Sequence, residues 1–229
     1  MITGTRTGIG KALAEHLLAA GHEVVGCSRK PGGIEHERYD HHQVDLTDTT
    51  AVKALFRELR RTHGHLDALI NNAGTSVMNH FMLTPEQTTR RLFDLNFFAV
   101  LSCCREAVKL LRRSEQPSTS IVALSTVAVP WAIDGQLAYS ASKAAVEQLV
   151  RVMSKELAEH GVRVNGLGVP PVSTTLTRTV PRERIDGLVG RQAIKRMCTT
   201  ADLCGPVEFL IGSQSAFVTG ETIFLGGVN

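Results

Sequence analysis

The sequence predicts an α/β fold, a doubly wound parallel sheet with helices on both of its faces. Two observations support this prediction. Short β-branched or apolar runs alternate along the chain with longer stretches of helical period, which is typical of parallel strands joined by helical crossovers. A glycine-rich turn also stands at the first crossing from strand to helix, where doubly wound folds place a tight turn.

Strands are expected where short apolar runs lie between turn residues. These runs span 24–27, 66–71, 120–124, 162–167 and 222–225, and a further strand ends at 45–47. The segment before Asp45 is short and rich in His and Gly, so the helix that would normally join these two strands is expected to be missing. Only Met1 and Ile2 precede the glycine-rich turn, so we expect almost no first strand; an incomplete N-terminus is one explanation.

Helices are expected at 8–20, 49–61, 85–111, 139–160 and 200–211. Within 49–61 the apolar residues recur at i, i+3, i+4 and i+7, at Val52, Leu55, Phe56 and Leu59. This spacing places them on one buried face of a helix. No repeat, low-complexity tract or linker divides the chain, so residues 1–229 are expected to form a single domain.

Composition excludes several functional classes. Hydrophobic residues make up 43% and charged residues 21% of the chain, which is globular composition. No apolar run approaches the ~20 residues of a membrane span, and no secretory signal opens the sequence. The net charge is only +3 and aromatics are 5%, which argues against a nucleic-acid partner. Five scattered cysteines without a CxxC pair indicate buried thiols in a reducing compartment, so a soluble, cytoplasmic protein is expected.

The glycine-rich turn is a candidate site for a pyrophosphate. Its glycines let backbone N–H groups approach an anion, and the helix that follows adds its positive N-terminal end. The alternative is a helix-entry turn without a ligand, but its position at the first crossing favours a dinucleotide. The candidate cofactor-binding residues here are Gly4, Thr5, Arg6, Thr7, Gly8, Ile9 and Gly10.

Two later segments bear on which dinucleotide binds. Ser28 and Arg29 follow the second strand, where NAD-binding folds carry an acidic residue for the ribose hydroxyls. An arginine without that carboxylate favours the 2′-phosphate, so NADP(H) is expected in preference to NAD(H). Asp45, followed by Leu46, is placed to accept the adenine amino group. The alternatives are a helix N-cap for Asp45 and a solvated charge for Arg29.

Tyr139 and Lys143 form a candidate acid–base pair. They are four residues apart in a helical segment, so they lie on one face, a turn apart. A nearby ammonium favours the phenolate, and Lys143 is therefore expected to lower the pKa of Tyr139 toward the working range. The alternative is a surface pair on an exposed helix.

With these motifs in view, the chain resembles the short-chain dehydrogenase/reductase family, of the compact single-domain type of the 3-oxoacyl-carrier-protein reductases. The motifs are TGxxxGxG at 3–10, NNAG at 71–74 and YxxxK at 139–143, in family order and spacing. The resemblance implies a Rossmann-like fold and identifies Asn96 as the catalytic asparagine. It also implies cofactor contacts at Asn72, Ala73, Gly74, Val172 and Thr174, with Tyr139 and Lys143 touching the cofactor as well.

The family also places a hydroxyl before the tyrosine to hold the substrate carbonyl. Counting back from Tyr139 without a gap reaches Thr126, whereas Ser125 takes the role if one residue is inserted. Either hydroxyl is able to donate the hydrogen bond. The family's Pro-Gly after the sixth strand is replaced here by Val169-Pro170, and Pro171 follows.

The expected function is NADP-dependent interconversion of a carbonyl and a secondary alcohol by hydride transfer, with Tyr139 as general acid and base. The departures from the family pattern keep an alternative open, a cofactor-binding regulatory or partner subunit without turnover. A homodimer or homotetramer is expected, because the helices at 92–111 and 139–160 carry more apolar surface than one sheet covers.

The substrate is not determined by the sequence. Segment 175–195 carries four arginines, which either attract an anionic substrate or are simply solvated; they are Arg178, Arg182, Arg184 and Arg191. No metal site is expected, because the flanks of the histidines are turn-like and polar, typical of exposed loops. These histidines are His41, His42, His63 and His65.

Overall fold

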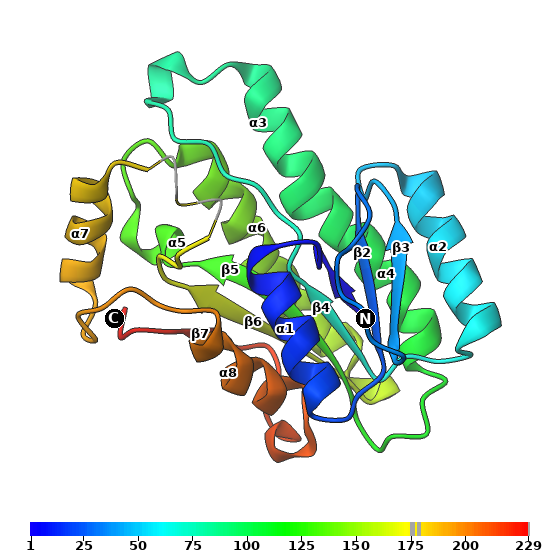
Figure 1. Cartoon of the computed structure of the whole chain (residues 1–229). Helices are drawn as coiled ribbons and strands as arrows, with labels where there is room; N and C mark the ends of the chain where they lie inside the picture. The colour runs from blue at the N-terminus through cyan, green and yellow to red at the C-terminus, as the bar shows by residue number, and fades with distance from the viewer. Residues whose placement is uncertain (175–176, 178–179, 229) are drawn as a thin grey trace.

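A computed structural model of the protein describes residues 1–174, 177 and 180–228. Within this part of the chain, all strand pairings of the central sheet are parallel and the strand order is β3-β2-β1-β4-β5-β6-β7 (Figure 1). The strands are β1 Ile2–Thr3, β2 Val24–Ser28, β3 Tyr39–Gln43, β4 Ala68–Asn71, β5 Thr119–Thr126, β6 Val162–Val169 and β7 Thr222–Phe224. The order reverses between β1 and β4, so a crevice is expected there, at the carboxyl ends of the strands.

Helices lie on both faces of this sheet, which confirms the predicted doubly wound α/β class (Figure 1). The helices are α1 Gly8–Ala19, α2 Thr49–Thr62, α3 Glu86–Phe93, α4 Ala99–Leu111, α5 Ala128–Trp131, α6 Leu137–Glu156, α7 Arg182–Arg191 and α8 Ala201–Ile211. Short helical turns are η1 Phe81–Leu83, η2 Asp94–Phe98, η3 Ala158–His160 and η4 Ser213–Ser215.

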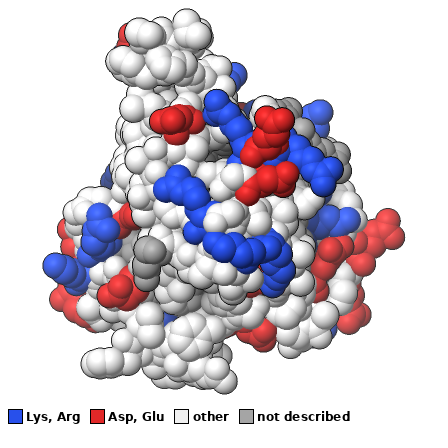
Figure 2. Space-filling model, turned by 90° about the vertical axis from the view of Figure 1, so that its left-hand side faces the viewer, with Lys and Arg blue, Asp and Glu red and all other residues white. Residues whose placement is uncertain are grey.

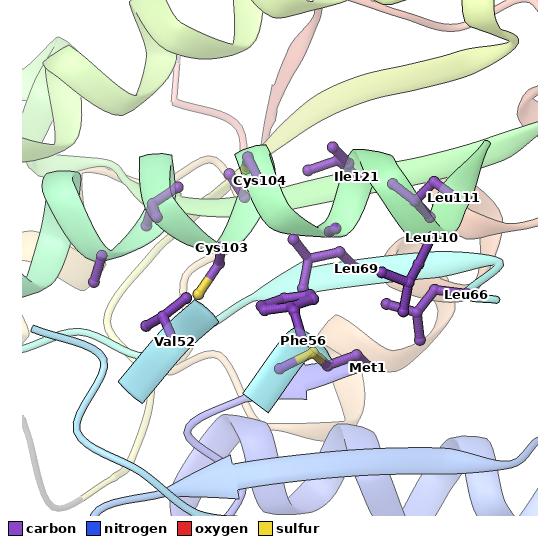
Figure 3. Close-up of a cluster of buried hydrophobic side chains, with 14 of the residues drawn as sticks. Met1, Val52, Phe56, Leu66, Leu69, Cys103, Cys104, Leu110, Leu111 and Ile121 are labelled. Atoms are coloured by element: carbon purple, nitrogen blue, oxygen red, sulfur yellow. The ribbon is translucent and has the colours of Figure 1, made fainter. Parts of the chain in front are cut away.

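Alternating side chains of the sheet build two cores. In β5, Ile121 and Ala123 face a core shared with α2, α4 and α6, whereas Val122 and Leu124 face a core shared with α1 and α8. Figure 3 shows the first core, in which the Phe56 ring of α2 lies among side chains of α4 and the sheet. Two-sided burial explains why these strands are continuous apolar runs.

The sequence-based predictions differ from the structure in four places. The strand expected to end at 45–47 ends earlier, because β3 spans Tyr39–Gln43. The helix expected at 85–111 is divided by η2, a π-helical turn over Asp94–Phe98. The short helix α5 and the helix α7 were not predicted. The expectation that His41 and His42 lie in a loop is wrong, because both belong to β3, where pairing with β2 holds them. The expected absence of a helix between β2 and β3 is confirmed, since 29–38 contains none.

The first strand, β1, has only two residues, but Met1, which precedes it, is also hydrogen-bonded to β4. The Met1 ammonium donates to the carbonyl of Ala68 at 2.8 Å, and the Met1 carbonyl accepts from the amide of Ile70 at 2.8 Å. Burial lowers the pKa of this ammonium to about 6. Met1 is therefore part of the sheet and of the core drawn in Figure 3.

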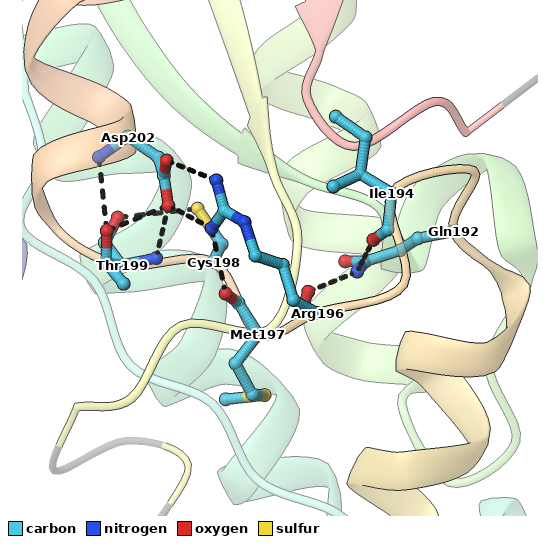
Figure 4. A network of polar contacts seen from close by, with 7 residues as sticks. All are labelled: Gln192, Ile194, Arg196, Met197, Cys198, Thr199 and Asp202. Atoms are coloured by element: carbon cyan, nitrogen blue, oxygen red, sulfur yellow. Dashed lines mark hydrogen bonds and ion pairs between the residues drawn. The ribbon is translucent and has the colours of Figure 1, made fainter.

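A polar network fixes the segment between α7 and α8 (Figure 4). The guanidinium of Arg196 forms two hydrogen bonds to the carboxylate of Asp202, at 2.6 and 2.7 Å, and Thr199 donates to the same carboxylate. Beside Arg196, Cys198 pairs with Val172 in an isolated β-bridge. This bridge connects the chain that follows β6 to the polar network.

Candidate active site

A cavity of about 710 Å³ opens at the carboxyl ends of β1, β2, β4, β5 and β6. Most of the residues that the sequence singled out line it. They are Gly4, Arg6, Thr7, Gly8, Ile9, Ser28, Arg29, Asp45, Leu46, Asn72, Ala73, Gly74, Ser125, Thr126, Tyr139, Lys143, Val172 and Thr174. Thr5, Gly10 and Asn96 are not in the wall; they lie behind it and support it.

The glycine-rich turn packs too closely for larger residues. A Cβ on Gly10 would lie 2.3 Å from the carbonyl oxygen of Gly4, so α1 approaches the turn only because this side chain is missing. Gly4 has φ +77°, in the left-handed region that favours glycine. Behind the turn, the Thr5 hydroxyl accepts a hydrogen bond from Tyr39 at 2.8 Å. The backbone at the N-terminus of α1 is thus open to the cavity, as a pyrophosphate requires.

The segment after β4 is fastened to the same turn. The side chain of Asn72 donates to the carbonyls of Thr3 and Gly4 at 2.8 and 3.2 Å. The Thr3 hydroxyl in turn accepts from the backbone amides of Asn72 and Ala73, both at 3.0 Å. These contacts hold the two walls of the crevice at a fixed separation on either side of the point where the strand order reverses.

The far end of the cavity carries Ser28, Arg29 and Asp45. Arg29 is exposed, and its neighbours in the chain at the end of β2, Ser28 and Lys30, carry no carboxylate. Asp45 accepts from the amide and hydroxyl of Thr47, and these bonds, with the charge of Arg29, lower the pKa of Asp45. The N-cap alternative for Asp45 is wrong, because Asp48 caps α2. Ser28, Arg29 and Asp45 therefore lie together at one end of the cavity.

Tyr139 and Lys143 lie one turn apart on α6; Lys143 is buried, and Tyr139 is partly exposed in the cavity wall. Lys143 Nζ donates to the carbonyl of Leu124 at 2.7 Å, and burial lowers its pKa to about 8. Burial raises the pKa of Tyr139, while a hydrogen bond with Thr126 opposes that shift. The expectation that Lys143 lowers the pKa of Tyr139 is wrong for this structure, because loss of solvent dominates both groups.

The two hydroxyls at the end of β5 have different partners. Ser125 Oγ donates to the buried carboxyl of Glu147 at 2.5 Å, while the Thr126 hydroxyl is the one whose proximity opposes the rise in the pKa of Tyr139. Thr126 Oγ1 also accepts from the amide of Ala128 at 3.2 Å. Glu147 was not singled out from the sequence. Glu147 lies four residues after Lys143 and therefore on the same face of α6; this spacing is the sequence signal that could have identified it.

Asn96 lies in the π-helical turn and is fully buried. Its Oδ1 accepts from the amide of Thr75, and its Nδ2 donates to the carbonyl of Thr75 and to the hydroxyl of Ser142. Because each of these bonds lies between 2.9 and 3.0 Å, the amide is fully engaged. It ties the segment after β4 to α6 beside Lys143, and such π-helical turns are common at functional sites.

The remaining wall is mostly apolar, and part of it comes from segment 175–195, which the sequence analysis associated with the substrate; the wall residues before it were not singled out from the sequence. It includes Met78, Ile133, Val180, Ile185 and Leu188, with the polar Gln136 among them. Basic and acidic side chains alternate on the outer surface on the side where α7 lies (Figure 2). The exposed ones on α7 are Arg182, Glu183, Arg184, Asp186 and Arg191; Arg178 lies outside the described residues.

No helix of the described residues is long and apolar enough to cross a membrane.

Comparisons with known proteins agree with this geometry. A family model described as short chain dehydrogenase matches residues 1–185. The 3-oxoacyl-(acyl-carrier-protein) reductase FabG of Staphylococcus aureus (strain Mu50) is 29% identical over 237 residues, 99% of this chain and 96% of that protein. The FabG protein of Escherichia coli is 24% identical over 233 residues, 99% of this chain and 95% of its own length.

The likeness extends to solved structures. The ligand-free aldohexose dehydrogenase of Thermoplasma acidophilum superposes with a TM-score of 0.90 at 27% identity, covering 99% of this chain and 92% of that one. The family model spans well over half of the chain, and both the sheet and the motif order agree with it. The chain therefore belongs to the short chain dehydrogenase family and is an NAD(P)-dependent oxidoreductase.

Proposed function

We propose that this protein interconverts a carbonyl and a secondary alcohol with NADP(H), and that Tyr139 is its general acid and base. The observation that carries the proposal is the cluster of Tyr139, Thr126 and Lys143 in the cavity wall, in which Thr126 and Lys143 are buried and Tyr139 is partly exposed. Burial disfavours the charged forms of Tyr139 and Lys143, so their convergence on one wall of a cavity favours a functional role over a structural one.

In this mechanism a bound nicotinamide supplies the hydride for reduction and accepts it for oxidation. Thr126 donates a hydrogen bond to the substrate oxygen and fixes its orientation. Tyr139 gives its phenolic proton to that oxygen as negative charge develops on it, and takes a proton back in the reverse direction. Lys143 supplies positive charge near the phenol and a donor for the cofactor ribose, and Asn96 holds Thr75 and Ser142 in place beside it.

The raised pKa of Tyr139 suits the direction of reduction. A buried phenol keeps its proton at neutral pH and is ready to donate it, whereas its deprotonation needs a positive charge beside it. Lys143, with a pKa of about 8, is mostly charged at pH 7 and lies one turn away on α6, although its charge does not outweigh the effect of burial on the phenol.

The preference for NADP(H) rests on Arg29. It lines the nucleotide end of the cavity, and no carboxylate stands at the end of β2 to accept ribose hydroxyls. Asp45 and Leu46 then contact the adenine, while Val172 and Thr174 lie toward the nicotinamide and the phosphates. Thr174 lies against the glycine-rich turn, 3.6 Å from where a Cβ of Gly8 would be.

Residues 1–229 act as one domain, and the working unit is a homodimer or homotetramer in the cytoplasm. Exposed apolar side chains on the helices expected to pair, Phe98, Leu137 and Val152, support the assembly. All five cysteines are free and buried, in keeping with a reducing compartment.

The test is consumption of NADPH by the purified protein with a panel of carbonyl compounds. The panel should include simple ketones and a 3-oxoacyl thioester, and a separate assay should follow formation of NADPH from NADP⁺ with an aldohexose, because the relatives are named for the last two substrates. Turnover of at least one compound supports the proposal. Tight NADPH binding without turnover across the panel would instead support a regulatory or partner subunit.

A further inference from the structure

Ser28, at the nucleotide end of the cavity, is hydrogen-bonded to a histidine that the proposed function does not use. Ser28 is the last residue of β2 and lines the cavity, whereas His41 lies in the neighbouring strand β3, behind the wall. The Nε2 atom of His41 lies 2.8 Å from the Ser28 hydroxyl oxygen. His41 is therefore placed to act on a bound nucleotide through Ser28.

The direction of this hydrogen bond follows from the other partner of Ser28. The Ser28 hydroxyl donates to the backbone carbonyl of Lys30 at 2.7 Å. A hydroxyl carries one proton, so the bond to His41 runs from the Nε2–H of His41 to Ser28 Oγ. In this arrangement Nδ1 of a neutral His41 keeps its lone pair, and it is the atom that takes up a further proton.

The loop after β2 is fastened to β3 around this pair. Gln43, two residues after His41 and on the same face of β3, donates from Nε2 to the carbonyl of Arg29 at 3.0 Å. At Gly32 a Cβ would lie 2.7 Å from Cδ2 of His41, so the loop packs over the imidazole because Gly32 has no side chain. These contacts fix the imidazole behind Ser28.

The groups around His41 favour its neutral form. Burial and the nearby His42 lower the pKa of His41, and Asp40 opposes that shift. The other charged or titratable groups beside it are Tyr39 of β3 and Arg29 and Lys30 of the loop. The two loop cations also disfavour a further positive charge, whereas a phosphate bound beside them favours it.

We propose that Ser28 donates its hydroxyl proton to the 2′-phosphate of NADP(H), and that His41 is the positioning residue that strengthens this donor once it is protonated. This inference rests on the proposed preference for NADP(H). When the phosphate is bound, Ser28 turns its proton from the Lys30 carbonyl to a phosphate oxygen, while Nε2–H of His41 continues to donate to Ser28 Oγ. Negative charge on the phosphate then favours a proton at Nδ1 of His41, and the imidazolium makes Ser28 a stronger donor. NAD(H) has a hydroxyl in place of this phosphate and gains nothing from the proton.

The test compares dissociation constants at two pH values. His41→Gln keeps a side-chain N–H for Ser28 but does not titrate. Because His41 takes up a proton when NADPH binds, the advantage of the wild type should grow as pH falls. We expect the Kd for NADPH of His41→Gln to be within about twofold of the wild type at pH 8.5 and roughly three- to tenfold higher at pH 6. Protonation of the 2′-phosphate itself is common to both proteins and cancels in this ratio, and the ratio for NADH should not depend on pH.

Two further variants separate this role from a general effect of charge. His42→Gln, at the adjacent position of β3, is the matched control and should keep the pH dependence of the wild type, because the contacts of His42 are to Asp40 and Glu58. In the Ser28→Ala protein the link to the phosphate is lost. Replacing His41 there as well should change the Kd for NADPH at pH 6 by less than about twofold.

Proton uptake gives a second measurement that does not need a His41 variant. Calorimetry at pH 6.5 in two buffers of different ionisation enthalpy should show that the wild type takes up more of a proton on binding NADPH than Ser28→Ala does. Equal uptake by the two proteins would overturn the proposal. So would a His41→Gln effect that is the same at both pH values, or one that persists in Ser28→Ala. Equal affinities of the wild type for NADPH and NADH count against the proposed NADP preference itself, whereas a clear NADPH preference without these pH effects counts against His41 alone.

Discussion

Ser125 Oγ donates a hydrogen bond to the carboxyl of Glu147, with 2.5 Å between the two oxygens. Both groups are buried, and the bond ties the end of β5 to the middle of α6. Burial raises the pKa of Glu147. Ser125 therefore has a partner inside the chain, which favours the neighbouring Thr126 as the hydroxyl that we propose for holding the substrate carbonyl.

The two hydroxyls should differ in what their loss does. Thr126→Ala is expected to lower kcat/KM about 10²-fold or more, because it removes the donor that orients the carbonyl, and Thr126→Ser should restore most of it. Ser125→Ala should leave kcat within a few fold but lower the melting temperature, because Glu147 loses its partner. Steady-state kinetics and thermal unfolding of the three variants check this. A larger kinetic loss in Ser125→Ala than in Thr126→Ala would reverse the assignment.

Tyr139→Phe should abolish reduction while NADPH still binds. The phenol contributes a proton and one hydrogen bond to the transition state, so its removal is expected to cost about 10²–10⁴-fold or more in kcat. The pyrophosphate is held at the glycine-rich turn and is unaffected. Kinetics on a turned-over ketone and a fluorescence titration with NADPH measure the two effects separately. Full activity in the Phe variant contradicts the mechanism, and loss of NADPH binding would make Tyr139 a structural residue.

Arg29→Ala should weaken NADPH binding and leave NADH nearly unchanged. A charge-assisted contact to the 2′-phosphate is worth about 1–3 kcal/mol, which corresponds to a rise in Kd of roughly 5- to 150-fold. Titration calorimetry of both cofactors with both proteins gives the four dissociation constants. Arg6→Ala, in the glycine-rich turn, serves as a control, since its loss should not distinguish NADPH from NADH. Equal affinities for the two cofactors in the wild type would refute the NADP preference.

Lys143→Met should change how stability depends on pH. The folded pKa of Lys143 is about 8 against an ordinary 10.5, so between these values the unfolded chain binds the proton and the folded protein does not. The stability of the wild type relative to the Met variant should therefore rise with pH across this window, by roughly 3 kcal/mol, and be flat below pH 7. Urea unfolding of both proteins at several pH values measures the difference. A difference that stays constant from pH 7 to 10 contradicts the burial of a charged ammonium.

The oligomer should depend on apolar side chains that are exposed on α6 and beside α4. Phe98, Leu137 and Val152 are 53%, 53% and 42% exposed in the isolated chain. Light scattering at micromolar concentration should give a dimer or tetramer, and Val152→Glu should shift it toward smaller species because a charge is costly to bury. The exposed Lys155→Glu, on the next turn of α6, is the charge control. A wild-type monomer would overturn the assembly.

Much of the fold and of the site was predictable because local rules decide them. Burial on both faces makes a strand such as 120–124 a continuous apolar run, and a helix with one buried face, such as 49–61, carries a stripe of period 3.6. The glycine-rich turn, NNAG and YxxxK are each short, so their spacing alone indicated which residues meet at the carboxyl edge of the sheet. The parallel, doubly wound sheet and the family resemblance followed from this information.

Other features depend on contacts between segments that are far apart in the sequence. Ser125 and Thr126 are adjacent hydroxyls, and only the packing of α6 on β5 decides that one meets Glu147 and the other Tyr139. The π-helical turn at Asn96 forms where its amide finds Thr75 and Ser142, which no local propensity specifies.

The pKa of Tyr139 is another property that sequence spacing alone did not decide. Sequence spacing put an ammonium one turn away and predicted a lowered value, whereas the structure raises it because the surrounding elements exclude water from both groups. The sequence by itself determined which residues lie on which helix face and at which strand end. The tertiary structure decided their burial and their partners, because desolvation and hydrogen bonding depend on every element that packs around a group and not on its neighbours in the chain.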